Sequence, residues 1–276
     1  MATTTKAAAP AKKSSGFKGV KDAWIILVIC CILAYCFYFF VLGDPSHFQG
    51  GDRTGHPADL MGTVYKGGFV VGLIITLLLT VIVLGVERFF AIKSASGKIN
   101  LAKFTAQVKE AIKAQDFTKA KELCNKMQGS VANVVLASIN MYQTVEGDDT
   151  LKKAQKIAKI QQAHEEATQL EMPTLTMNLP MIATIVSLGT LTALFGTVLG
   201  MIGSFQALSA GGGADSMALS AGISEALVNT ASGILTSWVA TVVYNFFSNK
   251  IDKLTFALDE VGYTIAATYD SNHHEA

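Results

Sequence analysis

Charged residues are scarce in this chain of 276 residues, because Asp, Glu, Lys and Arg make up only 16% of it and half of all residues are hydrophobic. Soluble globular domains carry about 25% charged residues, so the composition predicts an integral membrane protein. The lysines cluster beside apolar stretches instead of forming a separate basic surface. We therefore expect a lipid membrane around this chain and no nucleic-acid partner.

Motifs of catalysis are also missing. The sequence contains no P-loop, no nucleophile elbow and no glycine pattern typical of dinucleotide binding. His47 and His56 have no third ligand nearby in the sequence, and Cys30, Cys31 and Cys36 lie inside an apolar stretch, where thiols usually behave as small hydrophobes. We therefore expect no catalytic residue, no metal site, no disulfide and no cofactor.

Four apolar stretches are each long enough to cross a hydrocarbon core of about 30 Å as a helix. They are residues 23–42, 67–86, 179–205 and 218–247. The fold class predicted is all-α: a polytopic membrane protein with four transmembrane helices, of which the long ones extend into the cytoplasm, and a cytoplasmic helical bundle. The first span is read as an uncleaved anchor, because Gly43-Asp44-Pro45 after it is typical of a turn and not of a signal-peptide cleavage site.

The connecting segments set the orientation. Basic residues number thirteen in residues 87–178 and five in residues 1–22, against two in 43–66 and none in 206–217. Because positive charge stays on the cytoplasmic side, both termini are expected inside. Residues 1–22 are then a disordered basic tail, 43–66 a periplasmic loop, 87–178 a cytoplasmic helical region, 206–217 a periplasmic turn and 248–276 a cytoplasmic helical tail.

The third span has two adjacent lines of distinctive residues. At about 100° per residue, the hydroxyls of Thr190, Thr197 and Ser204 fall on one stripe. Beside it runs a strip of small residues that includes the GxxxG pair Gly196 and Gly200, a pattern that lets membrane helices approach closely. We expect this strip to pack against another helix.

The fourth span gathers polar groups on one side, where Asn229, Ser232 and Thr236 lie within about 40° of Glu225. Serine and threonine hydroxyls often only bond their own helix, so their spacing alone leaves a structural role open. A carboxylate inside a span is different, since it costs roughly 2.5–3.5 kcal/mol on insertion scales and such residues usually face water, a partner or a proton path.

Three segments carry a resemblance to a known family. They are ALFGTVLGMIGSF at 193–205, GISEALVNT at 222–230 and the ending Tyr244-Asn245. Their order and spacing are similar to those of the ExbB/TolQ/MotA proton-channel family, and of ExbB in particular, over roughly the last two-thirds of the chain. The resemblance implies an ion pathway that includes Thr197, Thr230 and Glu225, with Thr190, Ser204, Asn229 and Thr236 as possible further polar groups. Thr190 and Val239 replace common prolines of the family, and Asn229 replaces a small residue.

The resemblance also implies partners and a place. It suggests a homo-oligomer, a pentamer by analogy, in a bacterial inner membrane, around an ExbD-like protein whose single span carries an aspartate, with a TonB-like protein transmitting the motion to the outer membrane. Tol-type, gliding and secretion motors of the same family remain alternatives, as does a membrane scaffold that conducts nothing. The choice between protons and sodium also stays open.

Overall fold

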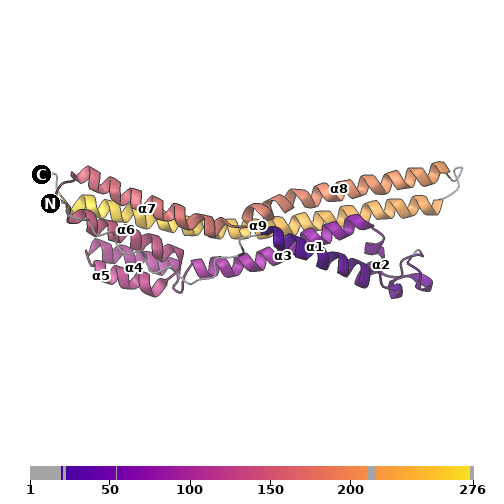
Figure 1. Cartoon of the computed structure of the whole chain (residues 1–276), viewed down its shortest axis with the longest axis horizontal. Coiled ribbons are helices and arrows are strands. Elements are labelled where there is room, and N and C mark those ends of the chain that lie inside the picture. The colour runs from indigo at the N-terminus through magenta and orange to yellow at the C-terminus, as the bar shows by residue number, and fades with distance from the viewer. Residues whose placement is uncertain (1–19, 21–22, 54, 211–215, 274–276) are drawn as a thin grey trace. The chain divides into compact units, whose positions relative to one another are not determined.

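The computed structural model describes residue 20 and residues 23–53, 55–210 and 216–273. All regular elements in these ranges are helices, accompanied by one isolated antiparallel bridge between Phe48 and Pro57 (Figure 1). The predicted all-α class is therefore confirmed. The basic tail apart from Val20, and the glycines at 211–213 of the expected turn, lie outside the described residues.

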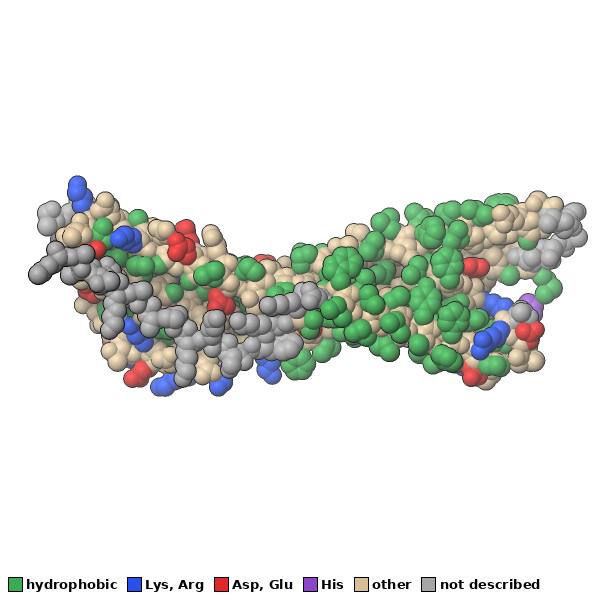
Figure 2. Space-filling model, viewed as in Figure 1, with side chains coloured by type: hydrophobic (Ala, Val, Ile, Leu, Met, Phe, Trp, Pro, Cys, Tyr) green, Lys and Arg blue, Asp and Glu red, His purple; other side chains and the backbone are tan. Residues whose placement is uncertain are grey.

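Within the residues that the structure describes, four helices are long and apolar enough to cross a membrane, as predicted. They are α1 (Ala23–Phe37, continued by a π-helical turn over Tyr38–Leu42), α3 (Phe69–Ala95), α8 (Leu179–Ala210) and α9 (Ser216–Asn272). In the space-filling view, hydrophobic side chains gather over α1 and over the stretch where α8 and α9 run together, and most charged side chains lie outside this area (Figure 2). The chain is a multi-pass membrane protein.

The helix ends differ from the expected boundaries at several points. The segment 206–217, expected to be a turn, is helical up to Ala210 and again from Ser216, and Gln206, Ala207 and Leu208 are residues that favour a helix. α3 starts at Phe69 instead of residue 67, since Gly68 has φ +74°, a left-handed conformation that ends helical geometry, and it continues beyond residue 86 to Ala95.

Backbone contacts divide the chain into two compact units. The membrane unit comprises Val20–Glu87 and Asn178–Phe247, and the bundle unit comprises Arg88–Met177 and the described residues from Ser248 on. The bundle unit contains α4 (Leu101–Lys113), α5 (Phe117–Met127), α6 (Ser130–Glu146), α7 (Lys153–Thr176) and the last part of α9. Its core is made of large side chains that are almost fully buried: Phe104, Val108, Ile112, Met127, Val135, Ile139, Tyr142, Leu258, Ile265 and Tyr269.

Two prolines lie near the connection between α7 and α8, and neither ends its helix. Pro173 lies inside α7, which continues to Thr176, and Pro180 is the second residue of α8. Proline is tolerated in the first helical turn because the N–H that it lacks has no partner there in any case. The break between α7 and α8 is therefore short and falls at Met177 and Asn178.

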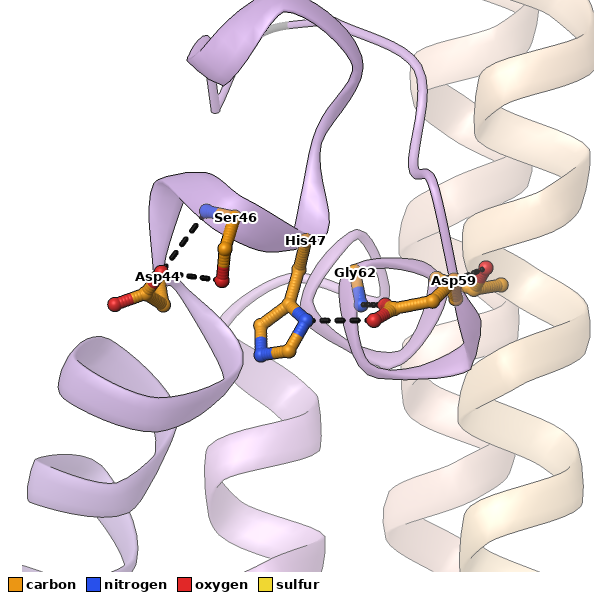
Figure 3. Close-up of polar contacts among 6 residues, drawn as sticks. Asp44, Ser46, His47, Asp59 and Gly62 are labelled. Atoms are coloured by element: carbon orange, nitrogen blue, oxygen red, sulfur yellow. Dashed lines mark hydrogen bonds and ion pairs between the residues drawn. The ribbon is translucent and has the colours of Figure 1, made fainter.

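The segment between α1 and α3 is ordered by side-chain caps (Figure 3). Asp44 accepts a hydrogen bond from the N–H of Ser46 at 2.9 Å, and Asp59 accepts one from the N–H of Gly62 at 2.9 Å, which starts α2 (Leu60–Tyr65). His47 Nδ1 lies 2.6 Å from the carboxylate of Asp59. The Gly62 N–H, and then His47, hold the pKa of Asp59 below its usual value. Stacking of Tyr38 on Tyr65, with ring centroids 4.7 Å apart, ties the end of α1 to α2.

Candidate functional site

α8 and α9 lie side by side and antiparallel in the membrane unit, and small residues form their contact (Figure 1). Gly189 faces Ser237, Ala193 faces Gly233, Gly200 faces Ala226 and Gly222 faces Ser204. A Cβ atom on Gly200 would come within 2.8 Å of the carbonyl oxygen of Gly222, which is backbone and cannot move away easily. Glycine is thus required at this point of the contact, and Gly196 and Gly200 both lie on it.

Thr197 of α8 and Thr230 of α9 meet in this contact. Their hydroxyl oxygens are 2.5 Å apart, and both side chains are half-buried. Each hydroxyl also lies within hydrogen-bonding distance of a carbonyl of its own helix, Ala193 O at 2.9 Å for Thr197 and Ala226 O at 3.0 Å for Thr230. One threonine can donate to the other while the second donates to its own backbone, so the pair forms a short directed chain of hydrogen bonds.

The other hydroxyls predicted for the pathway fall into two groups. Thr190 lies 2.9 Å from the hydroxyl of Ser237 on α9, and Ser204, which bonds Gly200 O at 3.0 Å, also reaches the Leu219 carbonyl of α9 at 3.3 Å. Thr236 donates to Ser232 O of its own helix at 3.0 Å and, within the described residues, to nothing on α8. The hydroxyl stripe of α8 therefore bridges to α9, whereas Thr236 follows the purely local pattern.

Asn229 is fully buried, and neither polar atom of its carboxamide has a hydrogen-bond partner among the described residues. The side chain lies against Gly196, where an added Cβ would be 2.7 Å from Asn229 Cγ and 2.9 Å from Nδ2. The carboxamide thus occupies space that any larger residue at position 196 would fill. Because Asn229 and Gly196 directly precede Thr230 and Thr197, this polar group and the threonine pair lie at the same level of the contact between α8 and α9.

Glu225 is half-exposed and faces a different neighbour. A Cβ added to Gly68 would come within 2.6 Å of Glu225 Oε1, so the carboxylate lies against the glycine break between α2 and α3. Thr197 and Thr230 are thus brought together, but no described contact joins Glu225 to them. Two features favour glycine at position 68: the left-handed backbone conformation there and the closeness of the Glu225 carboxylate.

A second carboxylate of the membrane unit belongs to Glu87, which is only 7% exposed. Its Oε1 accepts a hydrogen bond from the N–H of Val20 at 3.0 Å, and its Oε2 one from Asn178 Nδ2 at 3.3 Å. Asn178 Nδ2 also donates to the carbonyl of Val20 at 3.0 Å. These three residues join the entry of α1, the α3 helix and the start of α8. In the part of the chain that the structure describes, no group of three His, Cys, Asp or Glu could hold a metal ion.

Sequence reasoning missed the partners of the predicted residues. Gly222, Ala226, Gly233 and Ser237 of α9 form a small-residue strip that faces the one on α8. Their spacing of four residues within the pairs 222–226 and 233–237 is the signal that could have identified it. Gly68 could not have been found in this way, because its contact with Glu225 joins residues far apart in the sequence.

The part of the chain that contains α8 and most of α9 is similar to known proteins. Residues 127–260 match the model of the MotA/TolQ/ExbB proton channel family. Biopolymer transport protein ExbB-like 3 of Synechocystis is 38% identical over 98 residues, which are 35% of this chain and 46% of that protein. The Tol-Pal system protein TolQ of Haemophilus influenzae is 34% identical over 88 residues, 32% of this chain and 39% of that protein.

A longer match is less similar. The biopolymer transport protein ExbB of Xanthomonas campestris pv. campestris is 25% identical over 199 residues, which are 70% of this chain and 72% of that protein. The matches to the Synechocystis and Haemophilus proteins cover less than half of those proteins. Thr197, Glu225 and Thr230 all fall within the residues matched by the family model.

Proposed function

The chain belongs to the MotA/TolQ/ExbB proton channel family, and from this premise we propose that it is a proton-conducting, stator-like subunit of a motor complex in the bacterial inner membrane. The observation that supports the proposal most directly is the contact of 2.5 Å between the hydroxyls of Thr197 and Thr230, inside the two helices that match the family model. A hydroxyl pair can accept a proton on one side and release one on the other.

The role proposed for Glu225 is electrostatic. A carboxylate within a span is costly, about 2.5–3.5 kcal/mol on insertion scales, unless it meets water, a partner or an ion. Its half-exposed position beside Gly68 leaves it open to such a contact. In this proposal Glu225 attracts cations to the pathway, and the threonine pair lies further along it.

The proposed partners follow from the family. Several copies of the chain, a pentamer by analogy, surround an ExbD-like protein whose single span carries the aspartate that this chain does not supply. Proton passage then drives a TonB-like protein that energises outer-membrane transport. A Tol-type motor is the second candidate, because TolQ proteins are among the relatives matched.

Both termini and the bundle unit are proposed to lie in the cytoplasm, because twenty basic residues fall on that side of the assigned spans and two on the other. In a variant without the native cysteines, a cysteine in place of the exposed Gln49 should react with an impermeant reagent added outside intact cells. One in place of the exposed Asn125 should react only after lysis. Labelling of Asn125→Cys from outside would reverse the orientation.

Proton flux tests the proposed pathway. Thr197→Val and Thr230→Val keep the volume and remove the hydroxyl, and Glu225→Gln keeps the shape and removes the charge. Each variant should assemble with its partner in vesicles and conduct at least about tenfold less, a factor that corresponds to about 1.4 kcal/mol in a barrier. Thr236→Val is the matched control, because that hydroxyl bonds only its own helix among the described residues, and it should conduct normally.

The scaffold alternative makes the opposite prediction. If the hydroxyls only hold α8 against α9, removing one should weaken assembly by about 0.6 kcal/mol, the mean for hydrogen bonds between membrane helices. Normal flux in both Thr197→Val and Glu225→Gln, in samples that assemble normally, would rule out the proposed pathway.

A further inference from the structure

The buried carboxamide of Asn229 lacks hydrogen-bond partners among the described residues, a rare situation in a folded protein. Buried polar side chains nearly always have a partner in the protein or an ordered water, and in a membrane the surrounding lipid can supply neither a donor nor an acceptor. Asn229 is 0% exposed, and both Oδ1 and Nδ2 lack a protein partner in the described part of the chain. Something other than a described side chain must satisfy them.

The position of the carboxamide indicates what that partner is. Glycine at position 196 gives the carboxamide its space, since an added Cβ would come within 2.7 Å of Asn229 Cγ. Thr197 and Thr230, whose hydroxyls meet, are the next residues along each helix. An asparagine side chain has two donor hydrogens and an acceptor oxygen, and each threonine hydroxyl has a single proton and two lone pairs. In the threonine pair both protons are used, one between the hydroxyls and one toward a backbone carbonyl, so lone pairs remain available.

We propose that Asn229 and Gly196 form a binding site for one ordered water molecule between α8 and α9, and that this water lengthens the hydrogen-bonded chain of Thr197 and Thr230. A buried water typically makes about three hydrogen bonds. The carboxamide oxygen, the carboxamide N–H and a threonine lone pair are polar groups of the right kind at this place. What the water does rests on the proposed function, whereas its presence does not.

The proposal predicts which of two variants of Asn229 loses more proton flux, and a packing role predicts the opposite order. Leucine has the same number of side-chain heavy atoms and the same branching as asparagine but has no polar atom to bind water, whereas alanine leaves room for water opposite Gly196. If Asn229 only fills space, Asn229→Leu is the milder change. If it holds water, Asn229→Leu should lose at least about tenfold in proton flux, equivalent to about 1.4 kcal/mol in the barrier, and should lose more than Asn229→Ala.

Magnetic resonance of the protein in lipid bilayers tests the water without any flux measurement. With asparagine side chains labelled with ¹⁵N, the signal of Asn229, identified by its loss in Asn229→Ala, should receive magnetisation from water. Asn178 is the internal reference, because it is also buried but its Nδ2 donates to Val20 O and Glu87 Oε2. Transfer to Asn229 should be several times faster than to Asn178.

The outcomes separate this inference from the proposed function. No faster transfer to Asn229 than to Asn178 would overturn the water site, whatever the flux. Faster transfer together with normal flux in Asn229→Leu would overturn its part in conduction, and if that variant does not assemble, the transfer measurement on the unmodified protein still decides. Faster transfer in a protein that conducts nothing would keep the water site and overturn the proposed function.

Discussion

The membrane unit and the bundle unit hold their helices together by opposite means. α8 and α9 meet through glycine, alanine, serine and threonine, while their large side chains, such as Leu194 and Trp238, are exposed. In the bundle unit the large side chains are inside, and Phe104, Ile139 and Tyr142 are fully buried. The difference follows from the solvent of each region. Lipid gives no hydrophobic reason for helices to associate, so close backbone approach and hydrogen bonds must do it, whereas water drives apolar side chains into a core.

The same contrast applies to the buried polar groups. In the membrane unit some polar groups bond across the contact between helices, as Thr197 and Thr230 do, whereas the buried Thr236 bonds only its own helix among the described residues. In the bundle unit the notable one is His164 of α7, which is 8% exposed and packs against Gly262 of α9. Ser138 donates to Val134 O at 3.0 Å and lies 2.9 Å from His164 Nδ1, so the imidazole is held with the proton on Nδ1.

Gly200→Val should break the membrane contact most severely. The added side chain would start within 2.8 Å of the Gly222 carbonyl and 3.0 Å of the Ala226 nitrogen, both backbone, at a cost at or above the upper end of the roughly 1–3 kcal/mol typical of overpacking. Gly203→Val is the matched control three residues away, where an added Cβ meets nothing within 4 Å. The yield of monodisperse protein in detergent should collapse in the first variant and stay normal in the second; equal yields would contradict a contact made by small residues.

Ile139→Ala should weaken the bundle unit, whose helices are held together by large buried side chains. Emptying this fully buried position of α6 should destabilise the bundle unit by about 2–5 kcal/mol. The readout is Cys124, which is buried with a thiol pKa raised to about 12 by desolvation, and which reacts with a thiol reagent only when the bundle opens. With the other cysteines replaced, labelling of Cys124 should accelerate by an order of magnitude or more. Leu194→Ala, at a residue 60% exposed on α8, should leave the rate unchanged.

A smaller effect should come from pH through His164. Burial lowers its pKa below 6.5, although the carboxylates of Asp259 on α9 and Glu165 on α7 act to raise it. In the unfolded chain the imidazole therefore binds its proton at a higher pH than in the folded bundle. The stability that the neutral ring contributes is present above pH 6.5 and is lost as the pH falls from there through the folded pKa.

The protonated ring would also carry a second N–H, at Nε2, which has no acceptor among the described residues. The rate of Cys124 labelling in the unmodified protein should be divided at each pH by the rate in His164→Gln, so that the reactivity of the thiol itself cancels. This ratio should rise as the pH falls from 7.5 to 5.5. A ratio that does not change with pH would show that His164 is not responsible for the pH dependence of bundle opening.

Much of this fold could be predicted from the sequence, because helices in lipid and helices in water each have a recognisable pattern of apolar residues. Four apolar stretches identified the four spans, and the recurrence of Val108, Ile112, Val131, Val135 and Ile139 at helical spacing indicated a bundle between them. Helix ends were harder, because propensity carries α8 to Ala210 and a single left-handed glycine, Gly68, sets the start of α3. Local preferences of one or two residues decide such ends.

The candidate site was predictable only within each helix. Angular arithmetic placed Thr190, Thr197 and Ser204 on one stripe, but which helix they face depends on how α8 pairs with α9, which no single helix determines. The same arithmetic grouped Glu225 with Asn229 and Thr236, although Glu225 lies against Gly68 while Asn229 lies against Gly196. Residues 40° apart on a long helix can face different neighbours.

The attachment of α1 has a consequence for how this protein can change over evolution. Glu87 and Asn178 hold the N–H and the carbonyl of Val20, which are main-chain groups present in almost every amino acid. The side chain at position 20 is therefore free to vary, except to proline, which has no N–H to offer. Selection acts instead on Glu87 and Asn178, so relatives that have this first span should preserve that pair even where the residues leading into the span have diverged beyond alignment.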